Sequence, residues 1–189
     1  MKRIGILGDI GSGKTYVAKC FGFPVFNADL EVAKIYNNNK NIFRKLKKEF
    51  PLHFDSFPIK KKEIINVILS NKGNLKKIIR IIHREVRKKM NDFLKKNRNK
   101  KIVVLDVPLL LENKINKKKD ILIFVESNKL EILKRLKKRK NFNMKILNNF
   151  KKIQLPLDSK KKKSHYIIKN NFKKNSVKIR VKKIINNLI

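Results

Sequence analysis

The residues best suited to chemistry form a glycine-rich stretch near the amino terminus. Residues 8–15 read Gly-Asp-Ile-Gly-Ser-Gly-Lys-Thr and match the pattern G-x-x-x-x-G-K-[ST] in full. In this pattern the glycines let backbone N–H groups wrap around a phosphate, Lys14 places a positive charge near the β- and γ-phosphates, and the Thr15 hydroxyl can ligate Mg²⁺. The stretch predicts a site for nucleotide phosphates, the alternative being an incidental glycine turn before a helix.

Two carboxylates lie at or just beyond the ends of predicted strands. Asp29 comes after the apolar run Pro24–Phe26, at a strand-to-helix junction, and Asp106 belongs to the β-branched run Lys101–Val107. Ligands of open α/β sheets bind at the carboxyl ends of strands, so Asp29 is a candidate for ligand binding. Asp106 is a candidate Mg²⁺ ligand together with Thr15, against the alternative of a solvent-facing strand end. For Asp29 the alternative is a helix N-cap.

The elements that must position these residues alternate between strand and helix. Lys2–Leu7 is a short apolar run that fits a buried parallel strand, and the helix-forming stretch Lys14–Phe21 follows the glycine loop. Further strands are predicted at Asp120–Glu126 and His165–Ile168, with helical spacing over Lys129–Lys140 between them. This alternation predicts a three-layer α/β fold with a parallel central sheet.

A helical insertion interrupts the alternation. From Asn37 to Asn99 the chain is charged and has helical periodicity. One apolar face is formed by Leu75, Ile78, Ile79 and Ile82.

A length of 189 residues with 41% hydrophobic content suits a single domain with one core. The sequence contains no signal peptide and no apolar run of about 20 residues, so we expect a cytoplasmic protein without a membrane partner. The lone Cys20 is expected to pack in the core.

The net charge of +37 ordinarily suggests a nucleic-acid partner. However, the basic residues are 42 Lys against 9 Arg, spread along the chain and accompanied by 23 Asn and 26 Ile. Lys, Asn and Ile all have A/T-rich codons, so biased genome composition explains the charge and we predict no specific nucleic-acid partner. The lysine runs at 60–62, 117–119 and 160–163 are predicted to be exposed loops or helix ends. The alternative is a nucleic-acid-binding protein with a vestigial phosphate loop, whose binding would weaken steeply with salt.

A phosphate loop alone does not separate a kinase from a GTPase or a motor. The guanine-recognition sequence Asn-Lys-x-Asp is absent, and 189 residues are few for a motor with a coupling element. The size favours a small kinase that moves the γ-phosphate of ATP onto a small-molecule hydroxyl.

Further motifs follow the phosphate loop along the chain. They are Asn27-Ala28-Asp29, His83, Pro108-Leu109-Leu110-Leu111-Glu112 and Gln154-Leu155-Pro156-Leu157. In these motifs the sequence resembles bacterial dephospho-coenzyme A kinases over nearly its whole length. The resemblance implies transfer of the ATP γ-phosphate to the 3′-hydroxyl of dephospho-coenzyme A with the help of Mg²⁺. The nearest alternative is another P-loop kinase, acting on a nucleoside monophosphate or a small alcohol.

The resemblance also implies an organisation of the chain. We expect a P-loop kinase core at about residues 1–35 and 100–189, a helical acceptor region at about 36–98 and a mobile lid at about 138–157. The expected assembly is a monomer or a weak homo-oligomer.

Roles for single residues follow from the same resemblance. Asp29 would orient the ribose 3′-hydroxyl and accept its proton, while Lys14 and the lid residue Arg139 would offset negative charge during transfer. The acceptor pocket would include Asp29, His83, Arg87, Pro108 and Leu109. ATP would be held by Gly8, Gly11, Ser12, Gly13, Lys14, Thr15, Tyr16 and Asn170. Glu112 is expected either to be structural or to support residues that contact the ligands.

The sequence departs from the family pattern in several places. Arg84 stands where the family has proline, Phe150 stands near the expected second lid arginine, and Ser164-His165 differs from the usual start of the last strand. Lys151 or Lys152 could replace the missing arginine, although lysine is a less specific phosphate ligand. Alternatives remain for His83, as a surface histidine on a basic helix, and for Arg139, as a solvated arginine.

Overall fold

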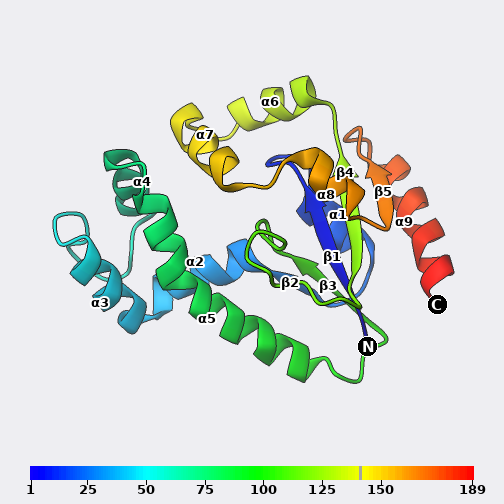
Figure 1. Ribbon diagram of the computed structural model, residues 1–189, viewed down its shortest axis with the longest axis horizontal. Coiled ribbons are helices and arrows are strands. Elements are labelled where there is room, and N and C mark those ends of the chain that lie inside the picture. Colours follow the sequence, from blue (N-terminus) through cyan, green and yellow to red (C-terminus); the bar gives the residue numbers. More distant parts are fainter. Residues whose placement is uncertain (141) are drawn as a thin grey trace. The chain divides into compact units, whose positions relative to one another are not determined.

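The computed structural model describes residues 1–140 and 142–189. In these residues five strands form one parallel sheet in the order β2-β3-β1-β4-β5 (Figure 1). The strands are β1 (Lys2–Gly8), β2 (Val25–Asn27), β3 (Ile102–Asp106), β4 (Ile121–Glu126) and β5 (Tyr166–Lys169). Every predicted strand is confirmed, with its ends within one residue of the predicted bounds.

The helices lie between the strands and in the predicted insertion. They are α1 (Lys14–Cys20), α2 (Ala28–Asn38), α3 (Lys40–Glu49), α4 (Lys61–Ser70), α5 (Asn74–Lys96), α6 (Lys129–Lys137), α7 (Met144–Ile153), α8 (Leu157–Lys162) and α9 (Lys174–Leu188). Helix α6 was predicted to reach Lys140. It ends three residues earlier, at Lys137, and Lys138 forms its C-cap.

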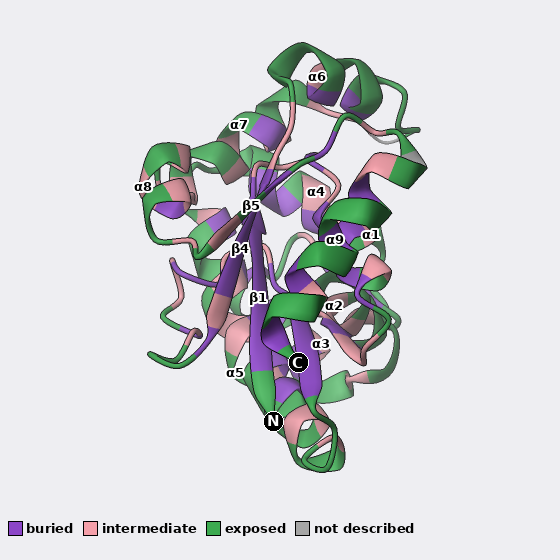
Figure 2. Ribbon diagram, turned by 90° about the vertical axis from the view of Figure 1, so that its right-hand side faces the viewer, coloured by how far each residue is buried: buried purple, intermediate pink, exposed green. Residues whose placement is uncertain are grey.

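Helices cover both faces of the sheet, which confirms the predicted three-layer α/β fold. On one face α1 contacts β1 and β3, and α9 contacts β5. Side chains alternate along a strand, so every second residue points to this face and joins the core. Strands β1 and β4 are buried along most of their length (Figure 2). The buried core residues are Ile4, Ile6, Val17, Ala18, Phe21, Ile102, Val104, Ile123, Val125, Ile168, Val177, Val181, Ile184 and Leu188.

The opposite face of the sheet is closed by α8 and by the turn that follows β3. Helix α8 contacts β1. At Gly5 a Cβ would lie 2.5 Å from Leu110 Cδ2 and 3.0 Å from Leu122 Cδ2. Glycine at this position of β1 therefore lets Leu110 pack directly on the strand backbone.

The chain divides into two compact units. The first unit contains the whole sheet and comprises Met1–Asn27, Lys96–Phe142 and Ile153–Ile189. The second unit comprises Ala28–Lys95 and Asn143–Lys152, and its described elements are helices. The bounds expected for an acceptor region and a lid remain predictions.

Within the second unit, α5 is the long amphipathic helix that its periodicity predicts. Its buried residues are Leu75, Ile78, Ile82, Val86 and Met90, spaced three or four apart. Ile79 is only half-buried, because it lies about 100° around the helix from Ile78 and so falls at the edge of the stripe. Lys77 on α5 pairs with Glu49 on α3, with 2.8 Å between Nζ and Oε1.

One prediction about the lysine runs is wrong. Residues 117–119 are exposed as expected, but Lys160 in the run 160–163 has a relative exposure of only 1%. Its ammonium is paired with a buried carboxylate, described below, and this partner makes the burial possible.

Cys20 lies at the end of α1 and packs against the core, as predicted. Among the helices of residues 1–140 and 142–189, none has the length and apolar content needed to cross a membrane.

Candidate active site

The phosphate loop joins β1 to α1 in a backbone conformation that favours glycine. Gly11 and Gly13 have φ angles of 86° and 88°, in the left-handed region. At Gly13 an added Cβ would also collide with the Asn170 side-chain amide. Position 13 therefore requires glycine both for its backbone angle and for space.

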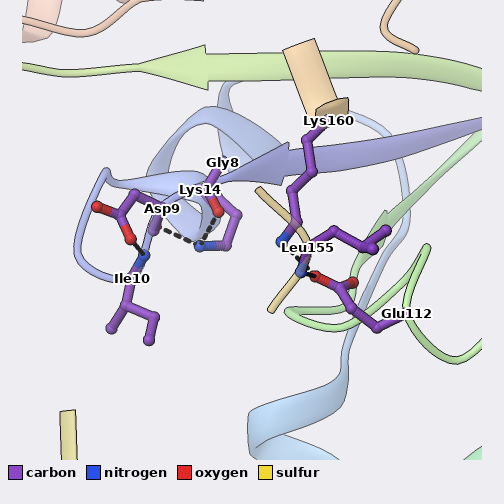
Figure 3. Close-up of polar contacts among 7 residues, drawn as sticks. All are labelled: Gly8, Asp9, Ile10, Lys14, Glu112, Leu155 and Lys160. Atoms are coloured by element: carbon purple, nitrogen blue, oxygen red, sulfur yellow. Dashed lines mark hydrogen bonds and ion pairs between the residues drawn. The ribbon is translucent and has the colours of Figure 1, made fainter. Parts of the chain in front are cut away.

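Lys14, the first residue of α1, curls back over the loop (Figure 3). Its Nζ donates to the Asp9 carbonyl oxygen at 2.7 Å and to the Gly8 carbonyl oxygen at 3.3 Å. The side chain is largely buried, so its charge is held within the loop. Phosphate oxygens are stronger, charged acceptors than carbonyl oxygens, so a phosphate bound in the loop can compete for this ammonium.

Two side chains hold the carbonyl of Ser12. The Asn170 Nδ2 donates to this oxygen at 2.8 Å, and the Ser127 Oγ donates to it at 3.0 Å. In a trans peptide the C=O and the following N–H point in opposite directions, so fixing the Ser12 carbonyl also aims the N–H of Gly13. The buried Asn170 thus positions the loop, while its predicted contact with a nucleotide stays a prediction.

Thr15 and Asp106 are joined directly by a hydrogen bond, while their role as metal ligands stays a prediction. Thr15 Oγ1 donates to Asp106 Oδ2 at 2.6 Å, although 91 residues separate them in sequence. Asn27 Nδ2 donates to the same oxygen, also at 2.6 Å. Asp106 has a relative exposure of 3%, which rejects the alternative of a solvent-facing strand end. These contacts bring together the carboxyl ends of β2 and β3 and the start of α1.

The donor set fits Mg²⁺ that is shared with a nucleotide. A hydroxyl has one proton and two lone pairs, so Thr15 can donate to Asp106 and still offer oxygen lone pairs to a cation. Mg²⁺ prefers oxygen ligands and is commonly held by one or two carboxylates plus phosphates. Within the described part of the chain, no group of three or more His, Cys, Asp or Glu side chains could hold a metal without such help.

Asp29 lies in the first turn of α2, two residues after the end of β2. Its side chain is exposed. Because the helix begins at Ala28, Asp29 lies inside the helix and the alternative of an N-cap is not supported. Pro108 and Leu109 follow β3 in a turn and are half-buried.

His83 and Arg87 lie one turn apart on α5 of the second unit. The pKa of His83 is lowered, first by burial and second by the nearby charge of Arg87. His83 Nε2 is buried and has no hydrogen-bond partner among the described residues. A half-buried imidazole with a buried, unsatisfied nitrogen differs from a solvated surface histidine, which was the alternative left open by the sequence.

The remaining two predicted residues lie in the first unit. Arg139 follows the C-cap of α6 and is exposed. Tyr16 is half-buried and its ring packs against the core, so a contact of this residue with ATP stays a prediction.

With this geometry established, comparison with known proteins identifies the family. The sequence model described as dephospho-CoA kinase matches residues 2–176. A dephospho-CoA kinase from Wolbachia sp. subsp. Brugia malayi is 33% identical over 98% of this chain and 97% of its own length. The chain belongs to the dephospho-CoA kinase family.

Solved structures share the fold of this dephospho-CoA kinase family member. A protein from Thermus thermophilus matches with a TM-score of 0.80 and 24% identity, over 98% of this chain and 96% of its own. A dephospho-CoA kinase from Campylobacter jejuni matches with a TM-score of 0.65 and 21% identity, over 99% and 97% of the two chains.

Sequence reasoning missed an arginine–aromatic pair beside the phosphate loop of this dephospho-CoA kinase family member. The Arg135 guanidinium carbon lies 4.4 Å from the centroid of the Phe172 ring. Phe172 has a φ of 62°, and its N–H donates to Asn170 Oδ1 at 2.9 Å. Left-handed φ costs a non-glycine residue roughly 1–2 kcal/mol and is often found at functional sites. The only local signal was the position of Phe172, two residues after Asn170, which is a predicted ATP contact.

A buried ion pair was also missed. Lys160 Nζ lies 2.6 Å from Glu112 Oε1, and the side chains have relative exposures of 1% and 9%. The same oxygen accepts the N–H of Leu155 at 3.0 Å (Figure 3). Glu112 is thus structural, as predicted, and it joins the turn after β3 to α8 and to the segment that precedes it.

Proposed function

We propose that this chain transfers the γ-phosphate of ATP to the 3′-hydroxyl of dephospho-coenzyme A, giving coenzyme A and ADP. The observation that carries this proposal is the hydrogen bond from Thr15 to Asp106 beside an intact phosphate loop. Membership in the dephospho-CoA kinase family supports the choice of acceptor. The hydroxyl oxygen attacks the γ-phosphorus, the bond from that phosphorus to the bridging oxygen of ADP breaks, and the proton leaves the hydroxyl.

The first unit supplies the groups for the phosphates. The N–H groups of the loop, aimed by Asn170 and Ser127, receive phosphate oxygens, and Lys14 turns from the Asp9 carbonyl to the phosphates. Thr15 and Asp106 would hold Mg²⁺, which when bound neutralises charge on the phosphate oxygens. The exposed Arg139 would reach the transferring phosphoryl group from the end of α6.

The acceptor side of the reaction is assigned to Asp29. Its carboxylate orients the 3′-hydroxyl and receives the proton late, because phosphoryl transfer needs mainly positioning and charge stabilisation. His83, Arg87, Pro108 and Leu109 are the proposed acceptor contacts. The unsatisfied Nε2 of His83 supports this role, since a buried polar atom without a partner can be satisfied by a ligand.

We also assign Arg135 and Phe172 to the nucleobase. Aromatic and guanidinium faces stack readily on a purine. The Phe172 ring lies near the loop, since a Cβ on Gly13 would be 3.7 Å from its Cε1. A base stacked on this pair would therefore stand next to phosphates held by the loop.

The deciding assay measures ADP released from ATP and Mg²⁺ with and without dephospho-coenzyme A, together with mass detection of coenzyme A. We expect ADP release that depends on the acceptor and matches the coenzyme A formed. Lys14→Ala should abolish this release, whereas Lys19→Ala, which removes an exposed lysine from the same helix, should retain it.

The assay also separates the alternatives. Release stimulated only by a nucleoside monophosphate or another small alcohol would assign a different P-loop kinase activity. A lack of stimulation by any acceptor, with salt-sensitive binding of nucleic acid, would favour the nucleic-acid alternative instead.

A further inference from the structure

Asn27 and Thr15 donate to one and the same carboxylate oxygen. Both donors lie 2.6 Å from Asp106 Oδ2. Asn27 ends β2 and Asp106 ends β3, and the two residues are partners in the parallel register of these strands. Residues in register present their side chains to the same face of a sheet, so the strand pairing itself brings the amide to the carboxylate.

The chemistry of the Asn27 side chain matters at this position. An amide nitrogen donates hydrogen bonds and is uncharged, whereas an ionised carboxylate only accepts. With the amide in place, the buried Asp106 is satisfied by two neutral donors and no cation is needed to hold it. Thr15 and Asn27 have no ionisable side chain, so Asp106 is the only acidic group among these three residues.

We propose that Asn27 is a positioning residue that fixes the Thr15–Asp106 pair in the absence of a cation, so that the divalent cation enters together with the nucleotide phosphates. This inference rests on the proposed function, which places Mg²⁺ at this pair. One carboxylate is a weak site for a strongly hydrated dication, and phosphate oxygens complete it. Asn27 thus suppresses binding of the cation alone.

An acidic residue at position 27 would have the opposite effect on binding of the cation alone. An aspartate at position 27 would place a second carboxylate within hydrogen-bond distance of Asp106. Two carboxylates at this separation repel each other unless a proton or a cation lies between them. Such a site would attract a dication before any nucleotide arrives.

The test measures binding of Mn²⁺ alone, without nucleotide, from the loss of the free-ion signal in electron paramagnetic resonance. We expect Asn27→Asp to bind Mn²⁺ at least about tenfold more tightly than the parent protein, a difference of about 1.4 kcal/mol. The matched control is Asn128→Asp, which adds the same charge at the N-cap of α6, where aspartate caps as well as asparagine. This control should bind Mn²⁺ like the parent.

Equal Mn²⁺ binding by Asn27→Asp and Asn128→Asp would overturn the proposal. If Asn27→Asp does not fold, Asn27→Ala provides the second test. It removes the donor without adding charge, so Mn²⁺ binding should stay weak while the Mg²⁺ concentration for half-maximal nucleotide binding rises severalfold. An unchanged Mg²⁺ requirement in Asn27→Ala would likewise overturn the role of Asn27. Because Mn²⁺ binding is read without turnover, failure of the proposed transfer reaction would be recognised separately.

Discussion

Lys160 and Glu112 form a buried ion pair, with 2.6 Å between Nζ and Oε1, on the face of the sheet that α8 covers. The pair has a counterpart one residue along the helix. Lys161 lies 2.6 Å from Glu126, but these side chains have relative exposures of 41% and 33%. Two ion pairs of equal length on one short helix therefore differ mainly in burial.

This contrast predicts very different effects of removing each lysine. Lys160→Met leaves the Glu112 carboxylate buried without a counter-ion and should lower the free energy of unfolding by about 3–5 kcal/mol. Lys161→Met removes a solvated pair and should cost less than about 1 kcal/mol. Urea denaturation of both variants measures the difference. Adding Glu112→Gln to Lys160→Met should recover much of the loss, and no recovery would show that the loss has another cause.

Two glycine substitutions separate backbone strain from steric conflict. Gly13→Ala places a side chain at φ 88° against the Asn170 amide, whereas Gly22→Ala meets φ 71° but has no atom within 4 Å of its Cβ. Both should lose roughly 1–2 kcal/mol of stability from the left-handed φ. Only Gly13→Ala should also weaken ATP binding, by about tenfold or more, because it displaces the amide that aims the loop. Calorimetry of ATP binding, beside thermal melting, tests both parts.

Arg135→Ala should weaken binding of ATP about three- to tenfold, in line with the usual strength of a cation–aromatic contact. Binding of inorganic tripolyphosphate should not change, because this ligand has no base to stack. The control is Lys137→Ala, which removes a neighbouring exposed cation from α6. If Arg135→Ala weakened the binding of ATP and of tripolyphosphate equally, Arg135 would be assigned to the phosphates instead of the base.

Asp29→Asn should retain ATP binding and lose transfer by at least about a hundredfold, since the amide cannot accept the hydroxyl proton. Asp158→Asn is the matched control, because Asp158 is the exposed second residue of α8 as Asp29 is of α2. Binding calorimetry and coenzyme A formation are measured on both variants. Turnover of Asp29→Asn at the parent rate would remove Asp29 from its proposed role.

The lowered pKa of His83 predicts a loss of stability in acid. The folded pKa lies below the unfolded value of about 6.5, so the unfolded chain binds more protons between these values. The free energy of unfolding should therefore be unaffected well above this range and fall as the pH drops through it. Thermal melting over the range should show a smaller acid loss in His83→Gln. Arg87→Gln should keep most of the loss, because burial is the larger cause of the shift.

Much of the fold could be predicted because its signals are local. The strands β3 and β4 are apolar up to the acidic last residue of each, as strands buried on both faces should be, and the spacing of Leu75, Ile78 and Ile82 is that of a helix. The phosphate loop is likewise a contiguous pattern. The burial of Lys160 could not be predicted from a local pattern, because a run of four lysines indicates a solvated surface. Its partner Glu112 lies 48 positions earlier in the sequence.

The sequence by itself determined the phosphate loop between β1 and α1, the alternation of strands and helices, and the positions of Asp29 just after one strand and of Asp106 at the end of another. Each depends on residues close together along the chain. Only the tertiary structure decided that Asn27 and Thr15 meet on one oxygen of Asp106, and that Arg135 lies on Phe172. Such contacts depend on strand register and on helix packing between distant segments, and no local pattern of residues encodes that geometry.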